Sequence, residues 1–277
     1  MQENSNDIIA MRAALDWYNA MGVDIAIGDE PIDRFAVPAI AQKSTPTTKS
    51  APSAKSLQGD GPANAPAAVQ SHMQPEVHNV DEAKAIAAAA TSLDMLRTSM
   101  ETFDGCPLKH RATNLVFAVG NPKADIMLVG EAPGREEDMQ GAPFVGRSGE
   151  LLDRILGAIG LDREQVFIAN TLPWRPPGNR NPTPAETAVC LPFLIRQVEL
   201  VAPKIIVTMG GAASKTLLQT DAGILRLRGK WQDIEVGHHS CASIATLHPS
   251  YLLRQPEQKA LVWRDMLSLK AKLTELG

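Results

Sequence analysis

The segment Ile126-Met127-Leu128-Val129-Gly130-Glu131-Ala132-Pro133-Gly134 joins an apolar run to a carboxylate that follows a glycine. The apolar run, residues 126–129, predicts a buried strand, so Glu131 is expected at the carboxyl end of that strand. Open α/β sheets bind their ligands at this edge. The segment therefore predicts an α/β sheet with a ligand site beside Glu131.

The residues that follow extend this predicted site. Phe144 lies in a polar loop, and the run Gly146-Arg147-Ser148-Gly149 opens an apolar helix. The first N–H groups of a helix have no partner within the helix and favour anionic or polar ligands. A carboxylate, an aromatic ring and backbone amides on one rim suit a planar, polar ligand.

Strand-like and helix-like segments alternate along the second half of the chain. Short apolar runs predict parallel strands at residues 125–130, 165–170, 204–210 and 241–247. A leading helix is predicted from Asp81 to about Thr102. Further helices are predicted between and after the strands, at residues 148–160, 184–202, 211–219 and 256–275. This alternation predicts an α/β fold, a three-layer α/β/α sandwich around a four-stranded parallel sheet.

Composition divides the chain into three parts. Residues 36–80 are rich in Ala, Pro and Ser and poor in large apolar side chains, which predicts a flexible linker. Residues 1–35 contain an amphipathic helical pattern, with Ile8, Met11 and Leu15 on one face. This helix could dock on its own domain, on another copy or on a partner. Residues 81–277 are expected to form the main domain.

Charge and cysteine content narrow the class of protein. The net charge is −4, yet residues 171–277 hold 13 Lys and Arg against 8 Asp and Glu, so that half suits phosphates. Cys106, Cys190 and Cys241 show no paired spacing, which argues against a disulfide scaffold and favours a reducing cytoplasm. No long apolar run or secretion signal is evident, so neither a membrane span nor export is expected.

Two further polar residues follow predicted strands. Asn170 ends the second strand, and His248 precedes Pro249 after the fourth. An amide can donate and accept hydrogen bonds together, and a histidine can donate one to a leaving group. Each has a structural alternative, because a strand-end Asn commonly forms an Asx turn and an acid such as Glu131 can simply be solvated.

The order of these motifs resembles the uracil-DNA glycosylase superfamily, and within it the thermophile-type family 4 branch. The resemblance runs from about Phe103 to the C-terminus and rests on GEAPG with EED and PFVG, on WRPPGNRNP, and on HPSYLLR. It implies the α/β/α glycosylase fold. It also implies an enzyme, expected as a monomer, that releases uracil from single- or double-stranded DNA to start base excision repair. Because none of the three motifs contains a lysine, no Schiff base is expected and the enzyme should be monofunctional.

The resemblance assigns roles to individual residues. Glu131 would position the attacking water, and His248 would donate to uracil O2. The expected uracil-binding residues are Ala132, through its backbone N–H, Glu137, which would exclude thymine, Phe144, which would stack on the base, and Asn170. The expected DNA contacts are Arg175, Asn179, Arg180, Ser250, Tyr251, Leu252, Leu253 and Arg254.

The chain departs from the family at the iron–sulfur cluster. The four cysteine positions of family 4 fall on Phe103, Cys106, Trp174 and Cys190, so two thiols remain. A [4Fe–4S] cluster generally needs four thiolates or close substitutes. We therefore expect no cluster, no metal site and no other cofactor. A less favoured alternative recruits another ligand such as His110.

Two other functions fit parts of the sequence. A non-catalytic DNA-damage-binding protein could retain the uracil pocket, although the combination of Glu131, Asn170 and His248 argues for turnover. A nucleotide-binding α/β enzyme unrelated to DNA is weakened because neither a P-loop nor a G-x-G-x-x-G follows the first strand.

Overall fold

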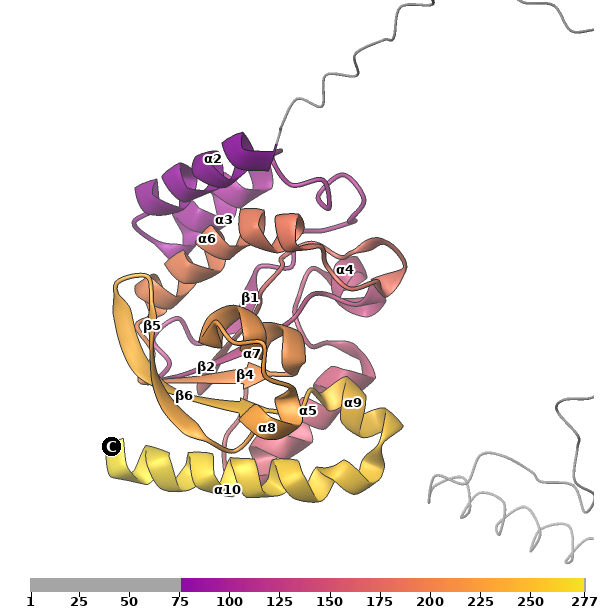
Figure 1. Cartoon of the computed structure of the whole chain (residues 1–277), viewed down its shortest axis with the longest axis vertical. Coiled ribbons are helices and arrows are strands. Elements are labelled where there is room, and N and C mark those ends of the chain that lie inside the picture. Colours follow the sequence, from indigo (N-terminus) through magenta and orange to yellow (C-terminus); the bar gives the residue numbers. More distant parts are fainter. Residues whose placement is uncertain (1–75, 277) are drawn as a thin grey trace, which may run out of the picture. The chain divides into compact units, whose positions relative to one another are not determined.

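The structure is a computed structural model, and it describes residues 76–276 of the chain (Figure 1). The expected helix within residues 1–35, and residues 36–75 of the expected linker, lie outside the described residues. Helix α2 (Glu76–Ala89) begins inside the range that the sequence assigned to the linker. Residues 76–80 of the predicted linker therefore belong to a helix.

The described part contains one mixed sheet. Its strands are β1 (Ala118–Gly120), β2 (Ile126–Gly130), β3 (Val166–Asn170), β4 (Ile205–Met209), β5 (Trp231–Val236) and β6 (His239–Thr246). The strand order is β1-β3-β2-β4-β6-β5, and β2, β3, β4 and β6 run parallel. The predicted α/β fold and its four parallel strands are confirmed, but the sheet has six strands rather than four.

The two additional strands are antiparallel and form the edges of the sheet. Strand β1 is only three residues long, too short to give a periodic signal. Strand β5 is mostly polar and half exposed, and it pairs with β6 through a tight turn at Gly237, whose φ of 64° favours glycine. Neither edge carries the continuous apolar run that marks the buried strands.

The remaining helices largely follow the predicted order. They are α3 (Leu93–Thr102), α4 (Arg135–Gln140), α5 (Gly146–Ala158), α6 (Pro184–Val201), α7 (Gly211–Leu218), α8 (Ile224–Leu227), α9 (Pro249–Arg254) and α10 (Lys259–Leu276), with short 3-10 turns at η1 (Pro177–Asn179) and η2 (Pro256–Gln258). The expected leading helix is two helices, because Ser92 caps α3 by accepting a hydrogen bond from the backbone N–H of Met95.

Helices cover both faces of the sheet, as Figure 1 shows. On strand β2, Ile126 and Leu128 pack in one core with residues of α5 and α10, whereas Met127 and Val129 pack in another with residues of α6 and α7. Strands β2, β3 and β4 are buried along their whole length. This burial explains their unbroken apolar sequences and gives the three-layer arrangement.

A third core lies outside the sheet, where α2 and α3 pack against α6. We call its centre the Trp174 cluster, defined by Phe103, Cys106, Trp174, Cys190 and Phe193, each at most 2 % exposed. Phe103 stacks against Trp174 and meets Phe193 edge to face, with ring centroids 6.5 and 5.2 Å apart.

Within residues 76–276, none of the helices combines the length and apolar character needed to cross a membrane.

Candidate active site

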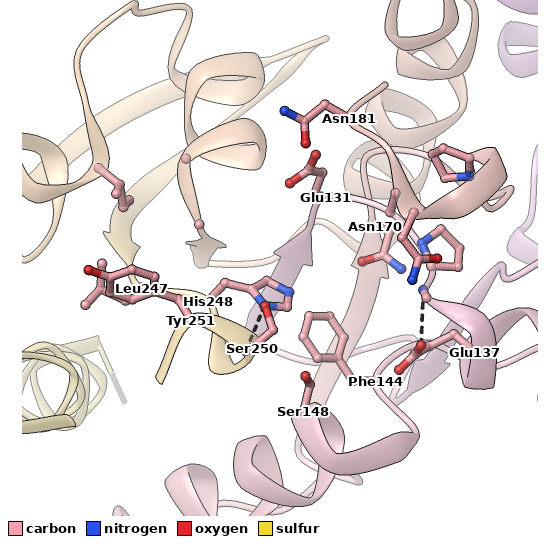
Figure 2. Close-up of a pocket in the computed structure, with 18 of the residues that line it drawn as sticks. Glu131, Glu137, Phe144, Ser148, Asn170, Asn181, Leu247, His248, Ser250 and Tyr251 are labelled. Carbon is pink, nitrogen blue, oxygen red and sulfur yellow. Dashed lines mark hydrogen bonds between the residues drawn. The ribbon is translucent and has the colours of Figure 1, made fainter. Parts of the chain in front are cut away.

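A pocket of about 650 Å³ opens at the carboxyl ends of the parallel strands (Figure 2). Glu131 follows β2, Asn170 ends β3, Gly210 follows β4, and Leu247 and His248 follow β6. The four parallel strands therefore each deliver a residue to one crevice, as expected for an open α/β sheet.

Gly130 allows two functional side chains to meet. In the parallel register it lies opposite Asn170. A Cβ atom at position 130 would lie 2.8 Å from the Phe144 ring and closer still to the amide oxygen of Asn170. The missing side chain therefore makes room for the ring and the amide side by side. Both residues are buried beneath the pocket, at 4 and 7 % exposure.

Glu131 stands at the rim of the same pocket and is half-buried. Its backbone carbonyl accepts a hydrogen bond from Leu172 N–H at 3.0 Å, which ties the loop after β2 to the loop after β3. Burial raises the pKa of the Glu131 carboxyl above its usual range. Ala132, the next residue, also lines the pocket.

Glu137 reaches the pocket from α4. Its carboxylate accepts the N–H of Gly134 at 3.1 Å, so the side chain folds back over the start of its own helix. A Cβ atom at Gly134 would lie 2.7 Å from that carboxylate oxygen. The glycine of the GEAPG motif therefore fixes the place of the Glu137 carboxylate in the pocket wall.

His248 is held in one tautomer. Its Nδ1 atom accepts the backbone N–H of Ser250 at 3.1 Å, and the Ser250 hydroxyl lies 2.8 Å from the same nitrogen. Because a backbone N–H can only donate, Nδ1 carries no proton and the neutral ring carries it on Nε2. Burial, followed by the positive charge of Arg254, lowers the pKa of His248 to about 4. The ring is therefore neutral at pH 7 and offers one N–H donor.

The aromatic ring of Phe144 and the imidazole lie next to each other. Their centroids are 5.3 Å apart and their planes are tilted by 31°. Figure 2 shows the Phe144 ring between His248 and Glu137, with Asn170 close to the ring. An aromatic face, an amide and a neutral N–H donor thus border one space.

Helix α9 carries the residues expected to contact DNA after His248. Tyr251 and Arg254 line the pocket mouth, and Leu253 is 38 % exposed. Leu252 differs, because it is 1 % exposed and packs in the core beneath α9. The expectation that Leu252 touches DNA is not met by this arrangement, because successive side chains of a helix point about 100° apart and this one faces the core.

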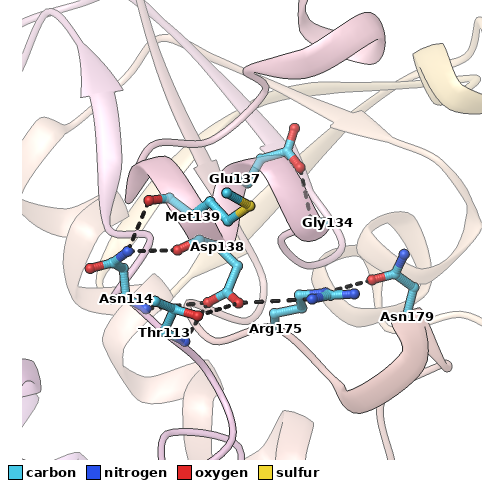
Figure 3. Close-up of polar contacts among 8 residues, drawn as sticks. All are labelled: Thr113, Asn114, Gly134, Glu137, Asp138, Met139, Arg175 and Asn179. Atoms are coloured by element: carbon cyan, nitrogen blue, oxygen red, sulfur yellow. Dashed lines mark hydrogen bonds and ion pairs between the residues drawn. The ribbon is translucent and has the colours of Figure 1, made fainter.

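The arginines of the RPPGNRNP segment are engaged within the protein. Arg175 donates from Nε to the Asn179 side chain at 2.7 Å, and its Nη1 lies 3.9 Å from the buried Asp138 (Figure 3). Arg180 donates to both carboxylate oxygens of Glu186 at 2.9 and 2.6 Å, and thereby lowers the pKa of that carboxyl to about 2. These side chains shape the loop around η1 at the pocket edge.

Asp138 is a structural residue that sequence reasoning missed. Its carboxylate accepts hydrogen bonds from the backbone N–H groups of Thr113 and Asn114 and from the Thr113 hydroxyl (Figure 3). This joins α4, which carries Glu137, to the loop before β1. The EED motif gave its position, but no sequence signal separated a buried acid from the exposed Glu136 beside it.

Further residues line the pocket that the sequence did not single out as binding residues, although Pro133, Gly134 and Ser148 belong to segments expected at its rim. They are Pro133, Gly134, Ser148, Pro176, Asn181, Gly210, Gly211, Ile224, Leu225 and Leu247. Gly210 follows a parallel strand, so the strand-end rule could have found it. Helix α8, which brings Ile224 and Leu225, is four residues long and gives no periodic signal.

The Trp174 cluster does not fit an iron–sulfur cluster. Cys106 and Cys190 lie with their Sγ atoms 3.7 Å apart, and the other two family positions hold the buried rings of Phe103 and Trp174. A ring offers no ligand to iron, so the donor set is two thiols. His110 is exposed, and within residues 76–276 no three side chains of the metal-binding types gather.

The fold and the pocket together define an α/β protein with a pocket at its strand ends, bordered by an acid, a buried amide and a neutral histidine. Residues 117–267 match the sequence model of the Uracil DNA glycosylase superfamily. The chain belongs to this superfamily.

Relatives support the same placement. The chain is 42 % identical over 170 residues to the type-4 uracil-DNA glycosylase of Archaeoglobus fulgidus, covering 60 % of this chain and 85 % of that protein. It is 38 % identical over 188 residues to the type-4 uracil-DNA glycosylase of Thermotoga maritima, covering 67 % and 96 %. It is 37 % identical over 184 residues to the type-4 uracil-DNA glycosylase of Sulfurisphaera tokodaii, covering 65 % of this chain and 84 % of that protein. The resemblance to the family 4 branch is therefore confirmed.

Proposed function

We propose that this protein is a monofunctional uracil-DNA glycosylase that hydrolyses the N-glycosidic bond of flipped-out deoxyuridine in DNA. The products are free uracil and an abasic site, which base excision repair then processes. The observation that carries the proposal is the convergence of Glu131, Asn170 and His248, from the ends of three parallel strands, with Phe144, from the segment before α5, in one pocket. Family membership and the type-4 relatives support it directly.

The base side of the pocket would bind uracil by shape and hydrogen bonds. The buried Phe144 ring offers a stacking face, and the Asn170 amide can accept from uracil N3–H and donate to O4. The Ala132 backbone N–H is a further donor at the rim. Asn170 is the last residue of β3, and Ala132 lies in the short loop directly after β2, so little reorganisation of these two groups is needed when the base enters.

His248 would stabilise the leaving group. Bond cleavage leaves negative charge on the uracil ring, and a donor aimed at O2 lowers the energy of that anion. The neutral imidazole donates from Nε2, because the Ser250 N–H occupies Nδ1. A neutral donor can stabilise the anion without first giving up a proton to it.

Glu131 would act on the sugar side. The transition state carries positive charge on the sugar ring, which a nearby carboxylate stabilises while it orients the attacking water. Partial burial strengthens this interaction, since screening by solvent is weaker there. The ionised form is required, so activity should fall as the pH drops through the raised pKa of Glu131.

Glu137 would separate uracil from thymine. Its carboxylate is fixed by the Gly134 N–H in the pocket wall, and we place it beside uracil C5. A methyl group at C5 would then meet a carboxylate that cannot move without losing its hydrogen bond.

Helix α9 and the η1 loop would contact the DNA. Tyr251, which lines the pocket, and the exposed Leu253 on the same helix suit the space left by the flipped base, and Ser250 and Arg254 suit phosphates. Arg175, Asn179 and Arg180 would act through the shape of the loop as well as through charge, given their internal partners.

The remaining expectations concern mechanism class and setting. Among the described residues that line the pocket none is lysine, which supports direct hydrolysis over a Schiff-base intermediate. We further propose that the enzyme is monomeric and cytoplasmic and that residues 81–277 form the catalytic domain. Light scattering of the purified chain at several concentrations would test the monomer.

We also propose that the enzyme works without an iron–sulfur cluster. The aromatic rings of the Trp174 cluster occupy the space where two of the four ligands would stand. Iron analysis and the visible absorbance of protein purified without oxygen would test this. Stoichiometric iron, bound by Cys106, Cys190 and other ligands, would contradict it.

The activity itself is tested with oligonucleotides that contain one uracil. Wild-type protein should produce strands that break on alkali treatment, whereas Glu131→Gln protein should produce far fewer. An oligonucleotide with thymine at the same position is the matched substrate control. Specific binding of the uracil strand without base release by the wild type would favour the damage-binding alternative.

A further inference from the structure

The backbone of Phe144 adopts an unusual conformation. Its φ is 52°, in the left-handed region that bulky side chains rarely occupy. Ala202 and Gln219, which share this region, are C-caps of helices, where it is common. Phe144 instead precedes α5, and its ring lies in the pocket beside His248. The stacking face therefore depends on a backbone geometry that its own residue type disfavours.

Two features outside the pocket hold this geometry. Arg163 donates from Nη2 to the Phe144 carbonyl and from Nη1 to the Pro143 carbonyl, the second at 3.4 Å. Gly149 on α5 lies against the same carbonyl, where any Cβ atom would collide with it and would also lie 3.0 Å from Arg163 Nη2. The Phe144 carbonyl is thus bound by a guanidinium and packs closely against a residue that has no side chain.

Arg163 is itself oriented by a carboxylate. Its Nε donates to Asp153 Oδ1 at 2.5 Å, and Asp153 lies on α5. Arg163 comes from the turn between α5 and β3, and it is not among the residues that line the pocket. It reaches the stacking ring only through the backbone at residues 143 and 144. The planar guanidinium of Arg163 thus donates hydrogen bonds from Nε, Nη1 and Nη2 at once, an arrangement that a lysine ammonium cannot reproduce.

We propose that Arg163, oriented by Asp153, is a positioning residue that holds Phe144 as the stacking face for the base. This inference rests on the proposed glycosylase function. Without the guanidinium, the Phe144 backbone is free to relax toward negative φ. The ring then leaves the place that Gly130 keeps open for it. Binding of the base weakens, whereas contacts to the DNA backbone remain.

The experiment compares Arg163→Met and Arg163→Lys with Phe144→Ala, alone and combined. The matched control is Lys204→Met, which removes an exposed ion pair with Asp125 at 3.1 Å, in the segment just before β4. Three quantities are measured: inhibition of excision by free uracil, the single-turnover rate on single-stranded uracil DNA, and affinity for an abasic-site oligonucleotide. Thermal unfolding checks that each variant folds.

Arg163→Met is expected to weaken uracil inhibition and slow excision, each by about tenfold, the size of one well-placed interaction. Affinity for the abasic oligonucleotide stays within about twofold of wild type, because the DNA contacts are elsewhere. Arg163→Lys is intermediate, and Lys204→Met matches the wild type. In a Phe144→Ala background, adding Arg163→Met costs little more, since both changes remove the same platform.

Two results would overturn the inference while the wild type remains active. One is unchanged uracil inhibition in both Arg163 variants. The other is a full additional loss in the Phe144→Ala background, which would show that Arg163 acts independently of the ring. A wild-type protein that releases no uracil would instead refute the glycosylase function, and this inference with it.

Discussion

The strand-end pocket and the Trp174 cluster belong to the same domain but differ in the kind of residue that each one buries. The pocket combines a half-buried acid, a buried amide, a neutral histidine and a strained aromatic residue. The Trp174 cluster combines rings and thiols that pack tightly. Residues in the pocket are placed for chemistry at a cost in stability, whereas those in the cluster stabilise the fold. Substitutions in the two regions should therefore separate activity from stability.

The largest effect on stability is expected from Trp174→Ala. This side chain is 1 % exposed, so its removal leaves a cavity and should lower the free energy of unfolding by about 3–5 kcal/mol. Urea unfolding measures the loss. Below the unfolding transition, the single-turnover rate should remain near that of wild type. A rate that falls with the stability would tie the cluster to the chemistry and weaken the comparison.

In the pocket, His248→Gln should have the opposite effect to Trp174→Ala: a large loss of excision rate with a small change in stability at pH 7. Loss of the Nε2 donor should slow excision by about 10²–10³-fold, the usual cost of one donor to a developing anion. Single-turnover kinetics at pH 7 measures this rate.

The same variant changes how stability depends on pH. The pKa of His248 is lowered to about 4, so the unfolded chain binds the proton more readily between that value and about 6.5. Wild-type stability should therefore decline as pH falls through this range, and His248→Gln should decline less. Parallel declines in the two proteins would contradict the buried neutral histidine.

The two regions also differ in how far sequence could predict them. Glu131, Asn170 and His248 were found because each lies at the end of a mainly apolar run, and parallel strands bring their ends together. The contacts of Arg163, Asp138 and Ser250 could not be found in this way. They depend on side chains meeting across loops, for which sequence carries no periodicity.

Local patterns failed in other places for related reasons. The leading helix was expected to be continuous, but the cap at Ser92 divides it. Strand β5 was missed because its outer position leaves it polar. Leu252 was grouped with the exposed end of α9, although helix geometry turns it into the core. Secondary structure could be predicted from the sequence where a strand is buried along its whole length. The edge strands of the sheet and the short helices could not be predicted in this way.

A smaller effect is expected at the pocket mouth. Leu253→Ala should slow excision from duplex DNA by about tenfold, because filling the gap left by a flipped base offsets part of an unstacking cost of a few kcal/mol. Single-stranded DNA carries less of this cost, so its rate should change little. Leu276→Ala, at an exposed leucine near the end of α10, is the matched control. Equal losses on both substrates would argue against a wedge.

The smallest change in rate is expected for Glu137→Ser, whose effect is on specificity. Uracil excision should fall by no more than about tenfold, since the pocket contacts of Asn170 and His248 remain. Thymine opposite guanine should become a detectable substrate, because the carboxylate held by Gly134 no longer opposes the C5 methyl group. Chromatography of the released bases measures both. A variant that still rejects thymine would place the discrimination elsewhere.

The most direct test of the account is the release of free uracil under single-turnover conditions by wild type and Glu131→Gln, followed by mass spectrometry. We predict free uracil and an unbroken abasic strand from the wild type, and a rate about 10²–10³-fold lower from the variant. The variant should also be at least as stable at pH 7, because burial disfavours the ionised Glu131. Equal rates for the two proteins would contradict the role of Glu131, and tight binding without uracil release would contradict the enzyme.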